Sequence, residues 1–199
     1  MDKKISAEEV KRFRELTGAG MMEAKSALME ADGDTSKAQE ILRKKGQFVA
    51  GKKSDRTTKQ GIVDSYIHGE GRIGVLLEVN CETDFVARNQ EFKNLVHDLA
   101  LHVAAQNPLY VSRDDVPVEL VEKEKEIYVE GAKASGKPGA IVEKIVAGRV
   151  EKFFQEICLL EQPFVRDSDI TVRELINQKI ATIGENIQVR RFTRYVLGE

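Results

Sequence analysis

The chain has 199 residues, of which 41% are hydrophobic and 32% are charged, a size and balance that suit one or two compact domains with a modest core. Its formal net charge of -2 lacks the basic excess of a typical nucleic-acid-binding protein, and the same balance excludes a strongly acidic disordered chain. Two cysteines, Cys81 and Cys158, are too few for a disulfide scaffold or a structural zinc site, and we interpret them as buried, reduced thiols.

Residues 1–46 are predicted to form three short helices. Ser6 and Glu9 have the spacing of a capping box, which starts a helix. The stretch TGAG ends the first helix, and DGD forms the turn between the second and the third. We expect the third helix to end at Gly46. Three helices in so short a segment make a bundle near the lower size limit of independent stability.

A linker and then a β-hairpin are predicted next. Residues 47–60 are polar and basic without a sustained period, which is typical of a linker. From Gly61 two β-branched runs flank GEG, which predicts a hairpin, and the amphipathic segment 89–106 predicts a helix that packs on its apolar face. The second run places a set of apolar residues on one face: Ile73, Val75, Leu77, Val79 and Cys81.

Residues 117–157 are predicted to form a helical hairpin with a turn at SGKPG, residues 135–139. Charged residues between its apolar positions indicate that the hairpin projects into water. The expected seam of the second helix consists of Ile141, Ile145, Val146, Val150, Phe153 and Ile157.

The C-terminal part predicts a loop at 162–165, a helix over 167–184 capped by Asp169 or Thr171, and a terminal strand over 186–199. This order of elements favours an α+β fold with an antiparallel-sheet core over repeated βαβ units. The predicted domain division is a three-helix domain at 1–46, a linker at 47–60, a core formed by 61–116 and 158–199, and a helical hairpin at 117–157 inserted in that core.

A G-x-G-x-x-G pattern is formed by Gly69, Gly71 and Gly74. The nucleotide-binding form of this motif needs a helix after it, because the helix N-terminus holds the pyrophosphate. A strand-like run follows here, so we interpret these glycines as hairpin-turn residues.

The histidines do not predict a catalytic or metal site. His97 and His102 are five residues apart and do not share a helical face, and His68 lies on the hairpin. Neither a P-loop motif nor a nucleophile-elbow motif is found. We therefore predict no catalytic residue, no metal and no cofactor, and a role in binding is the better starting point.

The N-terminus has no apolar segment of a signal peptide, and no stretch approaches the ~18 apolar residues of a membrane span. We therefore expect a cytoplasmic protein that does not bind a membrane.

Two apolar features are candidates for a binding surface. Neighbouring residues on a helix point about 100° apart, so of Met21 and Met22 one can fill the core while the other faces outward. The alternative is that both belong to a loosely packed core. The second feature is Phe85, which follows a strand and three polar residues; its alternative is ordinary packing under the next helix.

Three stretches in order resemble the signature segments of translation elongation factor Ts: LTGAGMMEAKSAL at 16–28, LEVNCETDFVARN at 77–89 and IGENIQVRRF at 183–192. The resemblance covers almost the whole chain and includes SGKP in the helical hairpin. Each motif alone is a weaker signal than the three together.

The resemblance implies a fold and a function. The N-terminal bundle would be ubiquitin-associated-like, and an antiparallel coiled coil would protrude from the α+β core. The protein would exchange guanine nucleotide on elongation factor Tu without catalysing a chemical reaction. Thr83, Asp84, Phe85 and Val86 would act on that partner's magnesium and switch region, and Met21 and Met22 would contact its nucleotide domain; no direct nucleic-acid contact is implied.

The sequence departs from longer members of that family in two ways. It holds one copy of the core hairpin-and-helix unit where longer members carry two, and it stops soon after YVLGE. The first departure predicts a homodimer and a two-to-two complex with elongation factor Tu.

Three other readings stay open at this point. The N-terminal bundle could be a general peptide or ubiquitin reader, which would leave Thr83–Val86 unexplained. A ribosome- or RNA-associated factor could use Arg190, Arg191 and Arg194, against which the near-neutral charge argues. An enzyme of another kind is the weakest reading, because no site for it is found.

Overall fold

The computed structural model describes residues 5–133 and 138–199. Over these residues it contains eight α-helices and five strands, and the predicted α+β class is confirmed. The chain divides into two compact units, each assembled from segments that are far apart in the sequence. Unit 1 comprises Met1–Val63, Glu78–Val96 and Glu174–Val189, and unit 2 comprises Asp64–Leu77, His97–Arg173 and Arg190–Glu199.

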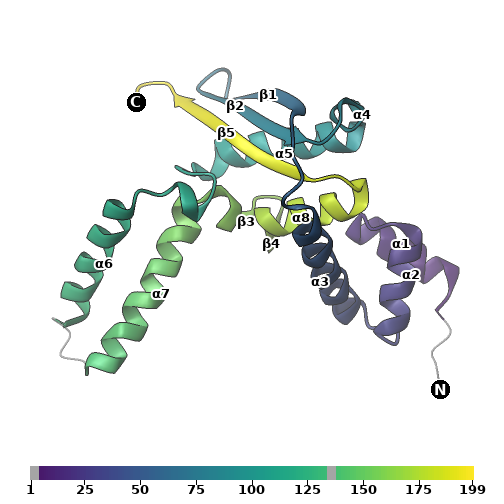
Figure 1. The fold of residues 1–199 in the computed structure, drawn as a ribbon, viewed down its shortest axis with the longest axis horizontal. Coiled ribbons are helices and arrows are strands. Elements are labelled where there is room, and N and C mark those ends of the chain that lie inside the picture. The colour runs from purple at the N-terminus through teal and green to yellow at the C-terminus, as the bar shows by residue number, and fades with distance from the viewer. Residues whose placement is uncertain (1–4, 134–137) are drawn as a thin grey trace. The chain divides into compact units, whose positions relative to one another are not determined.

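Three helices of unit 1 form a small bundle (Figure 1): α1 Ala7–Thr17, α2 Met21–Glu30 and α3 Thr35–Lys53. The predicted capping box is present, because Glu9 N donates to Ser6 Oγ at 3.2 Å and Ser6 N donates to a Glu9 carboxylate oxygen at 2.7 Å. The bundle core uses small and medium apolar side chains, which allow close helix packing: Val10, Phe13, Ala24, Ala27, Leu28, Ala31 and Ala38.

The prediction that the third helix ends at Gly46 was wrong. Helix α3 continues to Lys53, so residues 47–53 of the predicted linker are helical, and Gly46 is buried within the helix. A Cβ atom at Gly46 would lie 3.6 Å from the carbonyl oxygen of Asn177 on helix α8, Val172–Ile183. The glycine therefore serves close approach of two helices in unit 1, and it does not stop α3.

Three strands form the main sheet in the order β1-β2-β5: β1 Gln60–His68, β2 Ile73–Cys81 and β5 Ile187–Val196. The β1–β2 turn has positive φ at Gly69 (58°), Glu70 (57°) and Gly71 (90°), a conformation that favours glycine. This geometry confirms Gly69 and Gly71 as hairpin-turn residues, whereas Gly74 lies within β2 and not in the turn.

The predicted burial of β2 and of helix α5, Gln90–Gln106, is confirmed. Along β2 the buried residues alternate with more exposed ones, and Leu76 is 50% exposed. The apolar stripe of α5 is buried throughout: Phe92, Leu95, Val96, Leu99 and Val103.

Both cysteines are buried and free, as predicted. Burial raises the pKa of Cys81 and that of Cys158 to about 11 in each case. Both groups are therefore protonated thiols at neutral pH, and thiolate chemistry is disfavoured.

In unit 2, helices α6 Val118–Lys133 and α7 Gly139–Ile157 run side by side (Figure 1), after a short 3-10 helix, η1 Arg113–Asp115. The predicted turn lies mostly outside the described residues. The seam was predicted one residue off at its start, since Ile141 is 47% exposed and Val142 is 7% exposed. Val142 and Val150, eight residues apart, are the buried positions of α7.

An arginine joins the base of the helical hairpin to its surroundings in unit 2. Arg113 donates to Glu151 at 2.7 Å and to Glu161 at 3.0 Å, and its guanidinium lies 4.8 Å from the ring centroid of Phe154. Arg173 also donates to Glu161, at 3.0 Å. A bidentate arginine of this kind restrains orientation more than a single surface ion pair does.

A second small sheet was not predicted. Strands β3 Pro163–Phe164 and β4 Asp167–Thr171 pair antiparallel after a short 3-10 helix, η2 Leu159–Glu161. Residues 167–171 were expected to start a helix; instead α8 begins at Val172 and Asp169 lies inside β4. Strand β4 begins with Asp-Ser-Asp, and these residue types are rare in strands, so the sequence does not predict a strand here.

His102 lies at the centre of a buried polar network in unit 2. Val165 N donates to its Nδ1 at 3.1 Å, so Nε2 carries the proton and donates to Gln162 Oε1 at 3.0 Å. Gln162 Nε2 in turn donates to the carbonyl of Glu156 at 2.7 Å. Burial lowers the pKa of His102, with the hydrogen bond to Gln162 acting in the opposite direction. The neutral imidazole is therefore the form that the fold requires.

We predict that acid destabilises unit 2 through His102. Its folded pKa lies below the ordinary value of 6.5, so the unfolded chain binds the proton first as pH falls. The free energy of unfolding should fall below about pH 6.5, by at most ~1.4 kcal/mol per pH unit for one proton. Denaturant titrations between pH 5 and pH 8 measure this slope.

His102→Asn tests the assignment, because an amide oxygen can accept from Val165 N but does not titrate. The variant should lose stability at pH 8 and show a shallower pH dependence than the wild type. His68→Asn, at an exposed histidine, should keep the wild-type slope. An unchanged slope in His102→Asn would contradict the prediction.

Candidate functional site

The segment Thr83–Val86 begins a short helix in unit 1. Helix α4, Asp84–Arg88, follows directly on β2, and its N-cap is Thr83, whose Oγ1 accepts from Val86 N at 3.4 Å. The sequence places Phe85 just after a strand and three polar residues, and in the structure this place is the junction between a strand and a helix.

Phe85 projects from this helix into solvent. It leaves 80% of its surface exposed, more than any other large apolar side chain in the described part of the chain. The alternative that Phe85 packs under the following helix was therefore wrong. Ala87 is the buried residue of α4, at 7% exposure, and Val86 is half-buried, so the helix contributes few apolar contacts to the interior.

Asp84 lies beside the exposed ring. Its carboxylate pairs with Arg88 at 2.9 Å across one helical turn, and its side chain is 47% exposed. An exposed pair of this kind contributes little to stability. The carboxylate of Asp84 thus stays accessible to a cation or a donor of another molecule.

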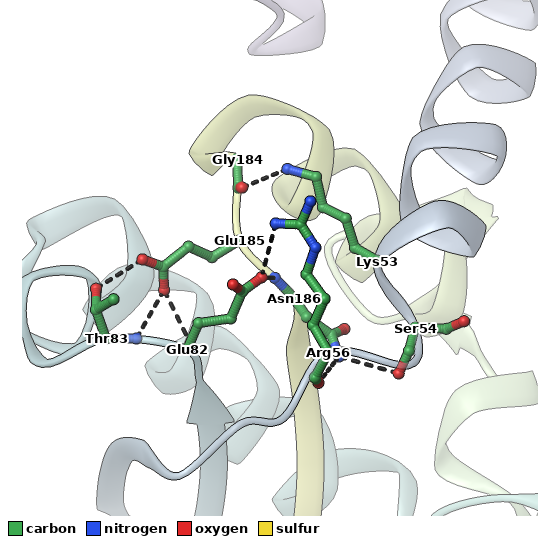
Figure 2. A network of polar contacts seen from close by, with 8 residues as sticks. All are labelled: Lys53, Ser54, Arg56, Glu82, Thr83, Gly184, Glu185 and Asn186. Carbon is green, nitrogen blue, oxygen red and sulfur yellow. Dashed lines mark hydrogen bonds and ion pairs between the residues drawn. The ribbon is translucent and has the colours of Figure 1, made fainter.

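A loop between α8 and β5 holds the start of α4 (Figure 2). The Glu185 carboxylate accepts hydrogen bonds from Glu82 N at 3.1 Å, from Thr83 N at 3.0 Å and from Thr83 Oγ1 at 2.6 Å. Sequence reasoning missed Glu185, although it lies in the stretch 183–192. No local pattern indicates a contact between residues 102 positions apart.

The neighbours of Glu185 connect the same loop to the chain that leaves α3. Asn186 N donates to Glu82 Oε1 at 2.7 Å, and Asn186 Nδ2 donates to the carbonyl oxygens of Ser54 at 3.2 Å and Arg56 at 2.9 Å. Lys53 Nζ donates to the carbonyl oxygen of Gly184 (Figure 2). All these contacts lie within unit 1.

Met21 and Met22 open α2, and both are exposed, at 48% and 75%. The expectation that one of them fills the core was wrong, and so was the alternative that both do. Ala24, Ala27 and Leu28 occupy the core-facing side of this helix instead. Both methionines thus belong to the surface of the bundle.

The histidines do not form a site together. His97 lies 3.5 Å from Asp64, His68 contacts the hydroxyl of Tyr66 at 3.2 Å, and His102 belongs to the buried network. Over residues 5–133 and 138–199, no group of three or more His, Cys, Asp or Glu residues is placed to hold a metal ion. None of the helices described there is both long and apolar enough to cross a membrane.

The arginines of the RNA reading are not a uniform exposed patch. Arg194 is half-buried, and its Nε donates to the carbonyl oxygen of Ala104 in α5 at 3.3 Å. That contact is a structural use of its charge inside unit 2.

Comparison with known proteins covers nearly the whole chain. The family described as Elongation factor TS matches residues 4–199. Elongation factor Ts of Acetivibrio thermocellus is 60% identical over 195 residues, 98% of this chain and 91% of the relative. The proteins of the same name from Moorella thermoacetica and Fervidobacterium nodosum are 60% and 57% identical, again over 98% of this chain, and are covered over 96% and 99% of their length. The chain therefore belongs to the elongation factor Ts family.

Proposed function

We propose that this protein promotes the release of GDP from elongation factor Tu during translation elongation, acting in the cytoplasm, and that α4 carries the decisive contact. Family membership supports nucleotide exchange as the activity. The single observation that carries the proposed site is the 80% exposure of Phe85 on an otherwise well-anchored segment. It also disfavours the peptide-reader alternative, which has no use for Thr83–Val86.

The exchange requires no covalent chemistry. A nucleotide held at nanomolar affinity is bound by about 12 kcal/mol and leaves slowly without help. A factor that binds the emptied partner better than the GDP-bound partner must, by linkage, weaken GDP binding by the same factor. The equilibrium between bound GDP and bound GTP is unchanged, and only the route is faster.

In this mechanism Phe85 and Asp84 act as a pair. The ring enters the nucleotide domain of elongation factor Tu, where its burial contributes roughly 1.5–3 kcal/mol. The Asp84 carboxylate disturbs the magnesium and switch region. Magnesium neutralises the phosphate charge in P-loop sites, so its displacement loosens the nucleotide. Thr83 and Val86 complete the segment as its cap and its half-buried support.

The N-terminal bundle supplies a second contact with the nucleotide domain through Met21 and Met22. Met29, seven residues after Met22 and thus on the same helical face, is also 58% exposed. Flexible thioether side chains suit an adaptable contact surface. The predicted division into a three-helix domain, a core and a protruding helical hairpin belongs to this proposal, with the first domain extended to Lys53, the end of α3.

A homodimer, and with it a two-to-two complex, is part of the same proposal. In unit 2 each strand of the main sheet carries one exposed apolar residue: Ile67 at 64%, Leu76 at 50% and Tyr195 at 70%. Apolar side chains that gather on one face of a sheet are typical of an interface.

The neighbouring residues indicate that the three share one face. Tyr66 contacts the ring of His97 on α5, with centroids 5.6 Å apart, and Arg194 donates to Ala104 on the same helix. Since side chains alternate along a strand, Ile67 and Tyr195 point away from α5, and Leu76 points away from the interior that its neighbours Val75 and Leu77 enter. A second copy placed on that face would form a symmetric interface.

We expect Phe85→Ala to slow stimulated GDP release about 10- to 100-fold, as loss of an anchor worth roughly 1.5–3 kcal/mol requires. Stopped-flow release of a fluorescent GDP analogue from elongation factor Tu measures the rate. Thermal unfolding should change little, because only about a fifth of the Phe85 surface is covered in the fold. Leu109→Ala, at a residue 60% exposed elsewhere, is the matched control and should keep full activity. Full activity of Phe85→Ala would rule out the proposed contact.

Met22→Ala should weaken binding without changing the maximal rate. Truncating one exposed contact of about 1 kcal/mol raises the concentration for half-maximal stimulation roughly threefold to tenfold. Met22→Leu, which keeps the volume, should retain most of the affinity. A fall in maximal rate with unchanged half-saturation would contradict this role.

Leu76→Glu should convert a dimer into monomers, because it places a charge at the centre of an apolar interface. Sedimentation equilibrium measures the mass, and Leu109→Glu is the control. A wild-type protein that is monomeric at all concentrations would refute the dimer.

A further inference from the structure

We propose that Glu185 is the positioning residue of the segment Thr83–Val86: its carboxylate fixes this turn so that Phe85 and Asp84 face outward. The assignment deepens the proposed function and rests on it for its effect on the partner. It gives a role to the stretch 183–192, which neither catalytic nor apolar reasoning explains.

Helix α4 needs an external anchor because its own contacts are weak. It has five residues, too few for a stable helix in isolation, and one of them is buried. At the end of β2 the Cys81 thiol also donates to the carbonyl oxygen of Thr83, at 3.2 Å. A thiol is a weak donor.

Glu185 supplies that anchor at the point where the strand turns into the helix. Its Oε2 accepts from two consecutive backbone N–H groups, those of Glu82 and Thr83, and its Oε1 accepts from the Thr83 hydroxyl (Figure 2). Three hydrogen bonds to one charged group restrain the orientation of the turn more than a single hydrogen bond would. The same hydroxyl then caps Val86 N, so the anchor continues into the first helical turn.

The loop that carries Glu185 is itself held on both sides. Gly184 N donates to the carbonyl oxygen of Ile180 at 3.0 Å and ends α8. Asn186, at 2% exposure, donates to Ser54, Arg56 and Glu82. A carboxylate on a loop so restrained can restrain its target in turn, as a supporting residue must.

The geometry separates this role from general stability. The Phe85 ring makes no use of Glu185 for burial, because the ring is exposed. Loss of the carboxylate should leave the bundle core and the apolar face of α5 intact. What changes is the spread of orientations of α4, and with it the fraction of molecules in which the ring is correctly aimed.

The test compares Glu185→Ala with Glu185→Gln and with Glu91→Ala. The glutamine keeps an oxygen that can accept from the two N–H groups and should retain most of the function. Glu91 forms a partly buried ion pair with Lys179 of α8 at 2.8 Å, so Glu91→Ala removes a carboxylate contact elsewhere in unit 1 without touching α4. All are studied as the full chain.

Hydrogen–deuterium exchange is the first readout. In Glu185→Ala the amides of residues 82–88 should exchange faster, while those of α1–α3 and the middle of α5 stay protected and the unfolding temperature changes little. Glu91→Ala should leave exchange at residues 82–88 unchanged. Unaltered exchange at 82–88 in Glu185→Ala would overturn the assignment whatever the activity.

GDP release from elongation factor Tu is the second readout. Glu185→Ala should slow stimulated release roughly tenfold or more, and combining it with Phe85→Ala should slow release no further than Phe85→Ala alone. An additive loss in the double variant, with faster exchange throughout unit 1, would show a merely structural role and overturn the proposal. If Glu185→Ala loosens 82–88 while neither it nor Phe85→Ala affects release, the positioning contact is supported and the proposed exchange site is what fails.

Discussion

A carboxylate that accepts three hydrogen bonds is the constraint on which the exposed segment depends. The start of any helix leaves backbone N–H groups without partners inside the helix, and the turn before it has the same need. Glu185 satisfies two such groups and the cap hydroxyl together. The segment is thus ordered by polar contacts at its N-terminal end, at Glu82 and Thr83. Because of this arrangement the Phe85 ring is not needed to hold the segment in place.

That division explains how a large aromatic can be both exposed and well oriented. A ring buried in its own chain is ordered by contacts that it would have to break before it met a partner. A ring on an unanchored loop meets a partner only after the loop has been ordered, at a cost in conformational entropy for each residue. Phe85 avoids both costs, since Thr83 and Glu82 carry the anchor and the interior contacts of α4 fall to Ala87 and Val86.

Local signals in the sequence predicted local structure well. The capping box of Ser6 and Glu9, the alternation along β2 and the stripe of α5 each arise from residues within one turn or one strand, and each is present. Gly46 misled the prediction because a glycine is also what two closely packed helices need, and the helix it approaches is 131 residues away. Strand β4 was not predicted because its residues are mostly polar and its strand conformation depends on pairing with β3, which the local sequence does not indicate.

The candidate site divides in the same way. The pattern singled out Phe85 and the two methionines, and the family resemblance added Thr83, Asp84 and Val86. Neither settled whether these side chains were buried, because exposure at a junction depends on what packs there. Glu185 could not be assigned from spacing, since the bond that defines its role closes a loop of 102 residues. A conspicuous motif without local chemistry, such as I-G-E-N, is informative only once the fold shows what it touches.

An exchange factor also faces an upper limit on how tightly it grips. If it bound the emptied partner too strongly, incoming GTP could not displace it, because linkage works equally in both directions. A contact built on one ring and one carboxylate supplies a few kcal/mol, enough to compete with part of the nucleotide's binding energy and little enough to be reversed. On the proposed function, rigidity contributed from Glu185 does not add to the grip. It raises the fraction of encounters in which a modest contact is made in the correct orientation.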